Sequence, residues 1–179
     1  MNFSDKFKKD EDANDWCNKG ADLLHLDDEK AIECFDEAIR NNPNMSYAWY
    51  NKGFALTNLG KLEESITCYD EVIKIKPDNY RSWHNKGNAL TTLGKYEEAI
   101  TCYDMAISIK PDNVYSWYSK GLDLYSLGKL EEVITCHDEV IKIQPDNVTW
   151  YVKGLALNKL GKHEEAKKCF DKAKELEQT

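Results

Sequence analysis

The sequence has six cysteines and four histidines, residue types that can bind a metal, and a cysteine can also act as a nucleophile. Five of the cysteines recur at intervals of 33 or 34 residues, and no Cys-x-x-Cys motif occurs. Equivalent positions in stacked helix pairs lie about 10 Å apart, whereas a disulfide needs Cα atoms within about 7 Å of each other. We therefore expect small, buried packing residues and no cofactor, with a metal or redox ladder as the alternative. The recurring cysteines are Cys34, Cys68, Cys102, Cys136 and Cys169.

The four histidines, His25, His84, His137 and His163, are scattered along the chain. The sequence has no Gly-rich phosphate loop, and no Ser/His/Asp or Cys/His set falls on facing elements. Cys136 and His137 are neighbours, but on a helix their side chains point about 100° apart. We expect the protein not to be an enzyme.

Composition and charge exclude other broad classes. The net charge is −8 with 31% charged residues, whereas binding to phosphate backbones requires a cluster of Lys and Arg. No apolar run is long enough to span a bilayer, and Met1–Asp12 is too polar for a signal peptide. We expect a cytoplasmic protein that binds no nucleic acid and does not insert into membranes.

A repeated sequence gives the elements that position these residues. The motif Trp-x-x-Lys-Gly occurs five times, and its tryptophans are 33, 34, 34 and 33 residues apart. Self-similarity at this period indicates a stacked array in which each repeat contacts mainly its neighbours. The five tryptophans are Trp16, Trp49, Trp83, Trp117 and Trp150.

Each repeat predicts two helices. In the second repeat, with Ser46 as position 1, the first helix is expected from about residue 47 to residue 59, and Gly60 is expected as its left-handed cap. The second helix is expected from about residue 62 to residue 76, ending before Pro77. The glycine at position 8 indicates close approach of a small residue at position 20. The first repeat has Leu26-Asp27-Asp28 in place of the Gly cap, so its turn should differ. The fourth repeat has a shorter junction before Trp150.

This pattern resembles the tetratricopeptide repeat: Trp at position 4, Gly at 8 and 15, a small residue at 20 and 27, an aromatic residue at 24 and Pro at 32. The resemblance covers residues 13 to about 176. It implies an all-α, right-handed superhelical solenoid of five antiparallel helix pairs. Residues 1–11 would be a flexible lead-in, and residues 12–179 a single solenoid with repeats at about 13–45, 46–79, 80–113, 114–147 and 148–179.

Two features depart from the family pattern. Position 7 carries lysine, which we expect to lay its stem over the apolar seam and to keep its ammonium in water; a basic binding stripe is the alternative. His137 stands at position 24, where the other repeats have Phe or Tyr, and we expect a packed histidine there.

The resemblance also implies that first helices line a concave groove, and that the protein binds a peptide or protein segment there. Aromatic side chains would give a large contact area at low entropy cost, although they could instead fill space between first helices. The candidate peptide-binding residues are Asn18, Tyr47, Tyr50, Asn51, Phe54, Arg81, His84, Asn85, Asn88, Tyr115, Tyr118 and Tyr125.

Position 6 forms a column of Asn18, Asn51 and Asn85. It resembles the asparagine ladder in the repeat domain of the O-linked GlcNAc transferase, because a carboxamide both donates to and accepts from a peptide group. A solvent-facing column without a ligand is the alternative. The carboxylate clamp of chaperone-binding members is rejected, since position 5 is never Lys. Arg81 and His84 still lie in the most polar and potentially cationic part of the predicted groove.

The resulting hypothesis is a non-catalytic protein–protein interaction scaffold, monomeric or weakly self-associating. The alternatives are a recognition arm or subunit of a glycosyltransferase-like enzyme complex, and a self-assembling repeat module. Lys167 and Lys174 replace isoleucines of the earlier repeats in the last second helix. We expect them to form a polar edge that limits end-to-end stacking.

Overall fold

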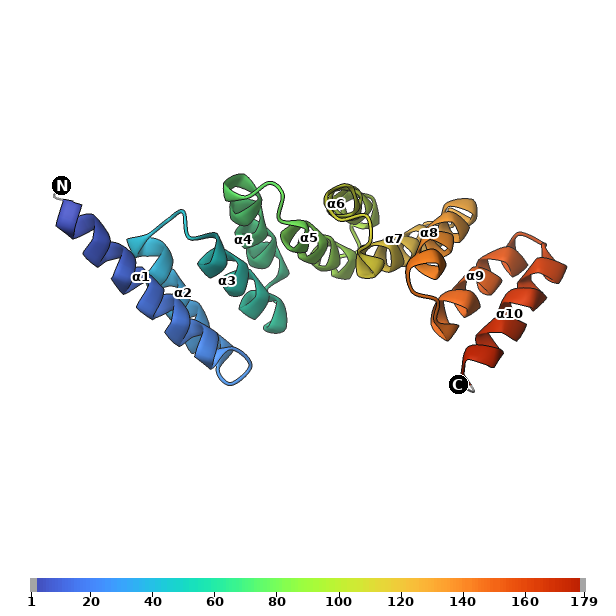
Figure 1. Ribbon diagram of the computed structural model, residues 1–179, viewed down its shortest axis with the longest axis horizontal. Helices are drawn as coiled ribbons and strands as arrows, with labels where there is room; N and C mark the ends of the chain where they lie inside the picture. The colour runs from blue at the N-terminus through green and yellow to red at the C-terminus, as the bar shows by residue number, and fades with distance from the viewer. Residues whose placement is uncertain (1–2, 178–179) are drawn as a thin grey trace. The chain divides into compact units, whose positions relative to one another are not determined.

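The computed structural model describes residues 3–177, with side chains described from residue 13 onward, and this part of the chain is helical without any strand (Figure 1). The all-α prediction is therefore confirmed. The helices are α1 (Phe3–Leu23), α2 (Asp28–Asn41), α3 (Ser46–Asn58), α4 (Leu62–Ile75), α5 (Tyr80–Thr92), α6 (Tyr96–Ile109), α7 (Val114–Ser126), α8 (Leu130–Ile143), α9 (Asn147–Lys159) and α10 (His163–Glu177).

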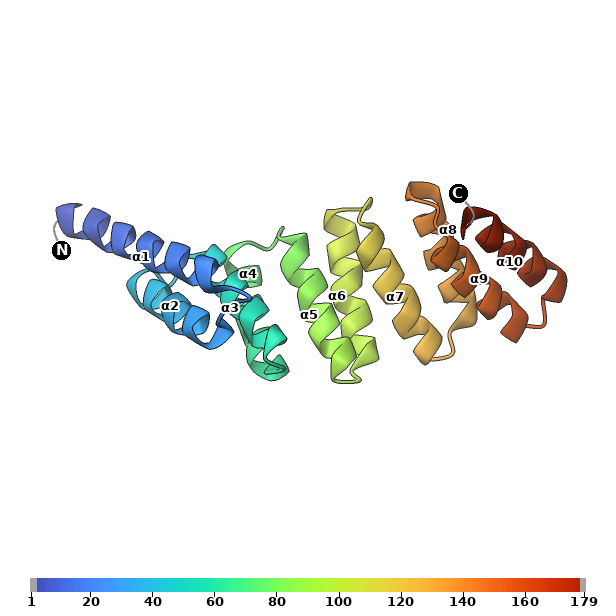
Figure 2. The same cartoon turned by 90° about the horizontal axis from the view of Figure 1, so that it is seen from below.

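These helices form two compact bodies, one through Leu93 and one from Gly94 onward. The N-terminal body contains α1 to α5 and the C-terminal body contains α6 to α10, so the third repeat gives one helix to each. Within the N-terminal body α1 packs on α2, α2 on α3, α3 on α4 and α4 on α5. Within the C-terminal body α6 packs on α7, α7 on α8, α8 on α9 and α9 on α10 (Figure 2).

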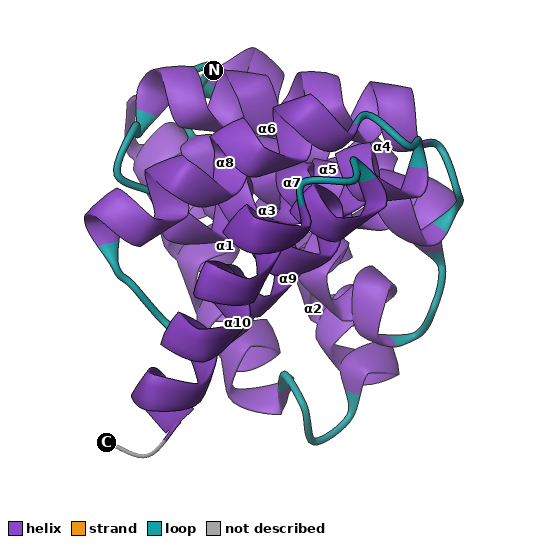
Figure 3. Ribbon diagram, turned by 90° about the vertical axis from the view of Figure 1, so that its right-hand side faces the viewer, coloured by secondary structure: helices purple, strands orange, loops and turns teal. Residues whose placement is uncertain are grey.

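Short capped loops join the helices (Figure 3). Gly60 has φ +74°, and after it the Lys61 N–H donates to the Leu56 carbonyl at 2.9 Å, which is the hydrogen bond of a left-handed helix cap. In the first repeat His25, at φ 67°, takes the left-handed position instead. The prediction that this turn differs is confirmed.

The glycine at position 8 is explained by a different neighbour from the one expected. A Cβ on Gly121 would lie 2.4 Å from the ring of His137, and one on Gly53 would lie 3.0 Å from the ring of Tyr69. The second helix does approach closely, but the residue that requires glycine is the ring at position 24, so the expectation that the small residue at position 20 is the close neighbour was wrong. Position 20 is nevertheless buried, as at Ala31 and Ala166.

The ends of the chain bear on the predicted domain boundaries. Helix α1 starts at Phe3, so residues 3–11 are helical and continuous with the first repeat. That this lead-in is loosely held stays a prediction, as do the repeat boundaries. Residues 1, 2, 178 and 179 lie outside the described residues.

Candidate functional site

Nine of the twelve predicted binding residues lie in the N-terminal body, all on first helices of their repeats. Helix α1 carries Asn18, α3 carries Tyr47, Tyr50, Asn51 and Phe54, and α5 carries Arg81, His84, Asn85 and Asn88. The other three, Tyr115, Tyr118 and Tyr125, lie on α7 in the C-terminal body. Each body therefore presents its own candidate surface.

Two of the predicted residues meet between α3 and α5. The Asn85 side-chain amide donates a hydrogen bond to the hydroxyl of Tyr50 at 3.0 Å, and both groups are partly buried. The Tyr50 ring meets the ring of Tyr69 edge-on, with centroids 6.0 Å apart. Tyr50 therefore fills space between helices, as the alternative interpretation expected, and the amide of Asn85 already has a partner.

The asparagine column does not form three equivalent sites. Asn18 is exposed, Asn85 is half-buried, and Asn51 is only 7% exposed. The amide nitrogen of Asn51 has no hydrogen-bond partner, and a buried donor left unpaired costs about 1–3 kcal/mol. The alternative of a solvent-facing column is therefore wrong at Asn51.

A hollow of about 320 Å³ lies where α1 approaches α3. Asn18 and Tyr47 line it together with Cys17 and Lys76, among others. Tyr47 is 57% exposed, so its ring is available to a ligand, and the exposed Asn18 carboxamide lies on the same hollow. Phe54 lies further along α3, where the ring of His25 meets it edge-on at 5.4 Å.

The polar part of the surface, on α5, carries one positive charge. Arg81 is exposed and donates from Nε to the Tyr80 hydroxyl at 3.3 Å. Burial lowers the pKa of His84, so its ring is neutral at pH 7, and its Nε2 lies 3.1 Å from the amide nitrogen of Asn88. Of the predicted cationic residues, only Arg81 is available as a charged anchor.

On α7, the three predicted tyrosines have different environments. Tyr115 is 75% exposed. Tyr118 stacks on His137 with ring centroids 5.7 Å apart, and burial raises the pKa of Tyr118. The Lys159 ammonium lies 4.2 Å from the centre of the Tyr125 ring. Tyr115 is therefore the most accessible of the three.

The last repeat has an exposed apolar surface that is not among the predicted binding residues. Val148 and Tyr151, on α9, are exposed and line a hollow of about 520 Å³ with Phe170 of α10. They occupy positions 2 and 5, the same repeat positions that selected Tyr47 and Tyr50. The repeat register could therefore have identified them.

The lysines at position 7 have a structural role that the sequence pattern did not reveal. In the second to fifth repeats these side chains are 17–20% exposed, and each ammonium pairs with an aspartate of the preceding repeat at 2.5–2.6 Å. Each also lies over the tryptophan three residues earlier. The expectation that the ammonium stays in water was therefore wrong for these four lysines, whereas Lys19 of the first repeat is exposed. The pairs are Lys52–Asp36, Lys86–Asp70, Lys120–Asp104 and Lys153–Asp138.

The tryptophans at position 4 also tie consecutive repeats together. Three of them donate the indole N–H to the carbonyl of the preceding proline at 2.9–3.0 Å: Trp49 to Pro43, Trp83 to Pro77 and Trp117 to Pro111. Trp150 follows the shortened junction, and its indole nitrogen is buried without a partner. One missing residue in the loop thus removes one inter-repeat hydrogen bond.

The cysteines are free and buried. Burial raises the pKa of Cys68 and Cys136 to about 11, so these thiols are protonated at neutral pH and are poor nucleophiles. Within residues 13–177 no group of three or more His, Cys, Asp or Glu side chains is arranged to hold a metal ion. None of the described helices combines the length and hydrophobicity needed to cross a membrane.

The repeat pattern matches a known family. The tetratricopeptide repeat profile matches residues 46–79, 80–113 and 148–179, and the chain belongs to this family. Residues 28–59 also match the protein prenyltransferase alpha subunit repeat. An uncharacterized protein of Methanocaldococcus jannaschii is 43% identical over 54 residues, which are 30% of this chain and 63% of that relative. The match therefore spans less than two thirds of the relative's length.

Solved structures share the fold. MamA from Desulfovibrio magneticus RS-1 has a TM-score of 0.85 at 24% identity, covering 93% of this chain and 96% of that one. Another MamA structure has a TM-score of 0.89 at 22% identity over 94% and 93% of the two chains. YrrB, described as a tetratricopeptide repeat protein with an unusual peptide-binding site, has a TM-score of 0.82 at 18% identity over 98% and 92%.

Proposed function

We propose that this protein is a non-catalytic interaction scaffold that binds an extended peptide segment on the first helices of its N-terminal body. The observation that carries the proposal is the hollow between α1 and α3, where the exposed Tyr47 ring and the exposed Asn18 carboxamide lie together. An aromatic face gives contact area at low entropy cost, and a carboxamide pairs with both groups of a peptide bond. YrrB has the same fold and is described as having a peptide-binding site.

The buried amide of Asn51 does not line this hollow, but it offers a second group on α3 that could hold a peptide backbone. Its nitrogen has no partner, and it lies on α3 one helical turn from Tyr47. A small reorientation of the side chain toward a bound peptide carbonyl would supply the missing acceptor. Because Asn85 is already bonded to Tyr50, we assign Asn18 and Asn51 the main role in holding a peptide backbone.

The charges of the protein favour a polypeptide partner. The net charge of −8 disfavours nucleic acid, and Arg81 offers an anchor for a single acidic side chain or a C-terminus. The protonated thiols of Cys68 and Cys136 support a non-catalytic role.

The test selects peptides from a random 12-residue display library on the intact protein and titrates them by fluorescence anisotropy. Tyr47→Ala should weaken binding more than about fivefold, as expected for an aromatic anchor worth more than about 1 kcal/mol. Asn18→Ala should weaken it about 2- to 13-fold, the range for one net hydrogen bond. Glu64→Ala, an exposed position on α4, is the matched control, with circular dichroism on each variant. Equal affinity of all three variants and the wild type would show that the peptides bind elsewhere.

A further inference from the structure

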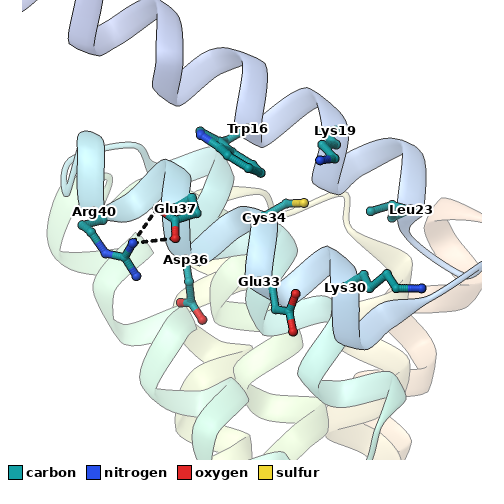
Figure 4. A pocket seen from close by; sticks show the side chains of 9 residues that line it. All are labelled: Trp16, Lys19, Leu23, Lys30, Glu33, Cys34, Asp36, Glu37 and Arg40. Carbon is teal, nitrogen blue, oxygen red and sulfur yellow. Dashed lines mark hydrogen bonds and ion pairs between the residues drawn. The ribbon is translucent and has the colours of Figure 1, made fainter.

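Among the described residues 3–177, helix α1 lacks the second neighbour that α3, α7 and α9 have. Each of those first helices packs on the second helix of its own repeat and on that of the preceding repeat, whereas α1 packs on α2 and makes only a slight contact with α3. The uncovered side of α1 forms one wall of a hollow of about 450 Å³ (Figure 4). We call this hollow the N-terminal slot; its walls include Trp16, Lys19 and Leu23 of α1 and Lys30, Glu33 and Cys34 of α2.

On the later first helices, the surface equivalent to this uncovered side of α1 is covered by the second helix of the preceding repeat. The same contacts recur between the two helices. In the C-terminal body α6 lies on α7, and Asp104 of α6 pairs with Lys120 at 2.6 Å. The carbonyl of Pro111, which follows α6, accepts the indole N–H of Trp117 at 2.9 Å. The same two contacts join α2 to α3 and α4 to α5.

The covering helix also contributes an aliphatic side chain. Ile100 of α6 packs against the cluster that contains Leu124 and Cys136 of the next repeat. Leu124 and Cys136 stand at positions 11 and 23, which in the first repeat are Leu23 and Cys34. The N-terminal slot therefore has the same apolar floor as the internal surface.

The polar groups of the slot lack these contacts. The ammonium of Lys19 lies 4.8 Å from the centre of the Trp16 ring, as the other position-7 lysines lie over their tryptophans. Lys19 is exposed, and among residues 13–177 the structure gives it no carboxylate partner and gives the Trp16 indole no acceptor. A nearby cation, Lys30, is already paired with Asp27 at 2.7 Å.

We propose that the N-terminal slot binds an amphipathic helix of a partner protein with the pattern Ile-x-x-x-Asp followed seven residues later by Pro. The aspartate pairs with Lys19, the isoleucine packs on Leu23 and Cys34, and the proline carbonyl accepts the Trp16 indole N–H. Residues four apart share one helix face, so one helix supplies the first two contacts together. This surface is distinct from the peptide-binding surface proposed on α1 and α3.

A second copy of the chain does not fit this pattern. Its last helix carries Asp171 but has Lys167 four residues earlier, where the pattern requires isoleucine. Lys167 would place a charge against the apolar floor formed by Leu23 and Cys34, which is unfavourable without a partner.

The probe is a synthetic peptide of residues 61–79, which contains Ile66, Asp70 and Pro77, with Cys68 replaced by serine and a helix-stabilising staple on its solvent-facing side. It is titrated against the intact protein by fluorescence anisotropy. We expect saturable binding and a shift of the Trp16 indole N–H signal in NMR spectra, assigned with the Trp16→Phe variant.

The charge contact is tested from both sides. Lys19→Ala should weaken binding of the peptide about 3- to 5-fold, as expected for an accessible ion pair. Lys19→Glu should weaken it further and should be rescued by a peptide with Asp70→Lys. Leu23→Asp should remove binding, with circular dichroism to verify folding.

Three results would overturn the proposal. The first is a peptide that binds wild type and Lys19→Glu equally, or does not bind at all. The second is peptide binding that is weakened by Lys86→Ala but not by Lys19→Ala, because the peptide would then have taken the place of α4 beside α5. The third is concentration-dependent mass in light scattering that Lys19→Glu abolishes, because the occupant would then be a second copy.

Discussion

Replacement of His137 by phenylalanine tests the most unusual packing position in the chain. His137 is fully buried, and neither ring nitrogen has a hydrogen-bond partner. It lies between Tyr118, which stacks on it, and Gly121, which leaves room for its ring. Equivalent positions hold rings without this polar cost, as at Phe35 and Phe170. His137→Phe keeps the ring and removes two unpaired buried nitrogens.

The expected effect depends on pH. Burial lowers the pKa of His137 from 6.5 to about 4, a larger effect than the opposing influence of Asp146 and Asp138. Because the unfolded state then binds more protons between pH 6.5 and 4, the folded protein loses stability as pH falls through that window. With 1.36 kcal/mol per pKa unit, the full loss is about 3 kcal/mol, of which about 2 kcal/mol is reached at pH 5.

The assay is urea unfolding followed by circular dichroism at pH 7.5 and pH 5. His137→Phe should be more stable than wild type at pH 7.5 by about 1 kcal/mol, because it removes buried unpaired polar groups. Its advantage should grow by about 2 kcal/mol at pH 5. His163→Gln, at an exposed position on α10, is the control and should keep the wild-type pH dependence. An advantage of equal size at both pH values would refute the assignment of His137 as a buried neutral ring.

Two further predictions concern the contacts between repeats. A double-mutant cycle of Lys120→Met and Asp104→Asn, measured by urea unfolding, should give a coupling free energy of up to about 1 kcal/mol that falls in 1 M salt, because both side chains are partly exposed; a coupling of zero at low salt would remove the ion pair as a contributor. Lys167→Ile combined with Lys174→Ile should promote end-to-end association measured by light scattering, because both lysines are exposed on the last helix. A double variant that stays monomeric at high concentration would contradict the role of a polar edge.

The sequence alone determined the elements of the fold. Its period predicted the helix pairs, and the expected range of the first helix in the second repeat, about 47–59, is within one residue of the observed Ser46–Asn58. Gly60 adopts the predicted left-handed conformation, and Asn79 caps α5 by accepting from the Ser82 N–H at 3.1 Å. These features are local, because helix propensity, caps and proline act within a few residues.

The environments of the candidate residues required the tertiary structure. Asn18 and Asn51 occupy the same repeat position, yet one is exposed and the other is buried. Helix α3 packs between two second helices, whereas α1 packs against one, so the same repeat position has different neighbours in the two repeats. Repeat position alone therefore does not determine the accessibility of a side chain, since accessibility depends on which neighbouring helices are present.

The contacts between repeats also could not be predicted from repeat position alone. The aspartates that pair with the lysines recur at the repeat interval, but they lie 15 or 16 residues before those lysines in the sequence. The packing of each of these second helices on the next first helix brings the two charges together. Trp150 keeps its sequence motif but loses its hydrogen bond after the shortened junction. The sequence therefore determined which side chains recur, and the packing of consecutive helices decided which of them are paired, buried or available to a partner.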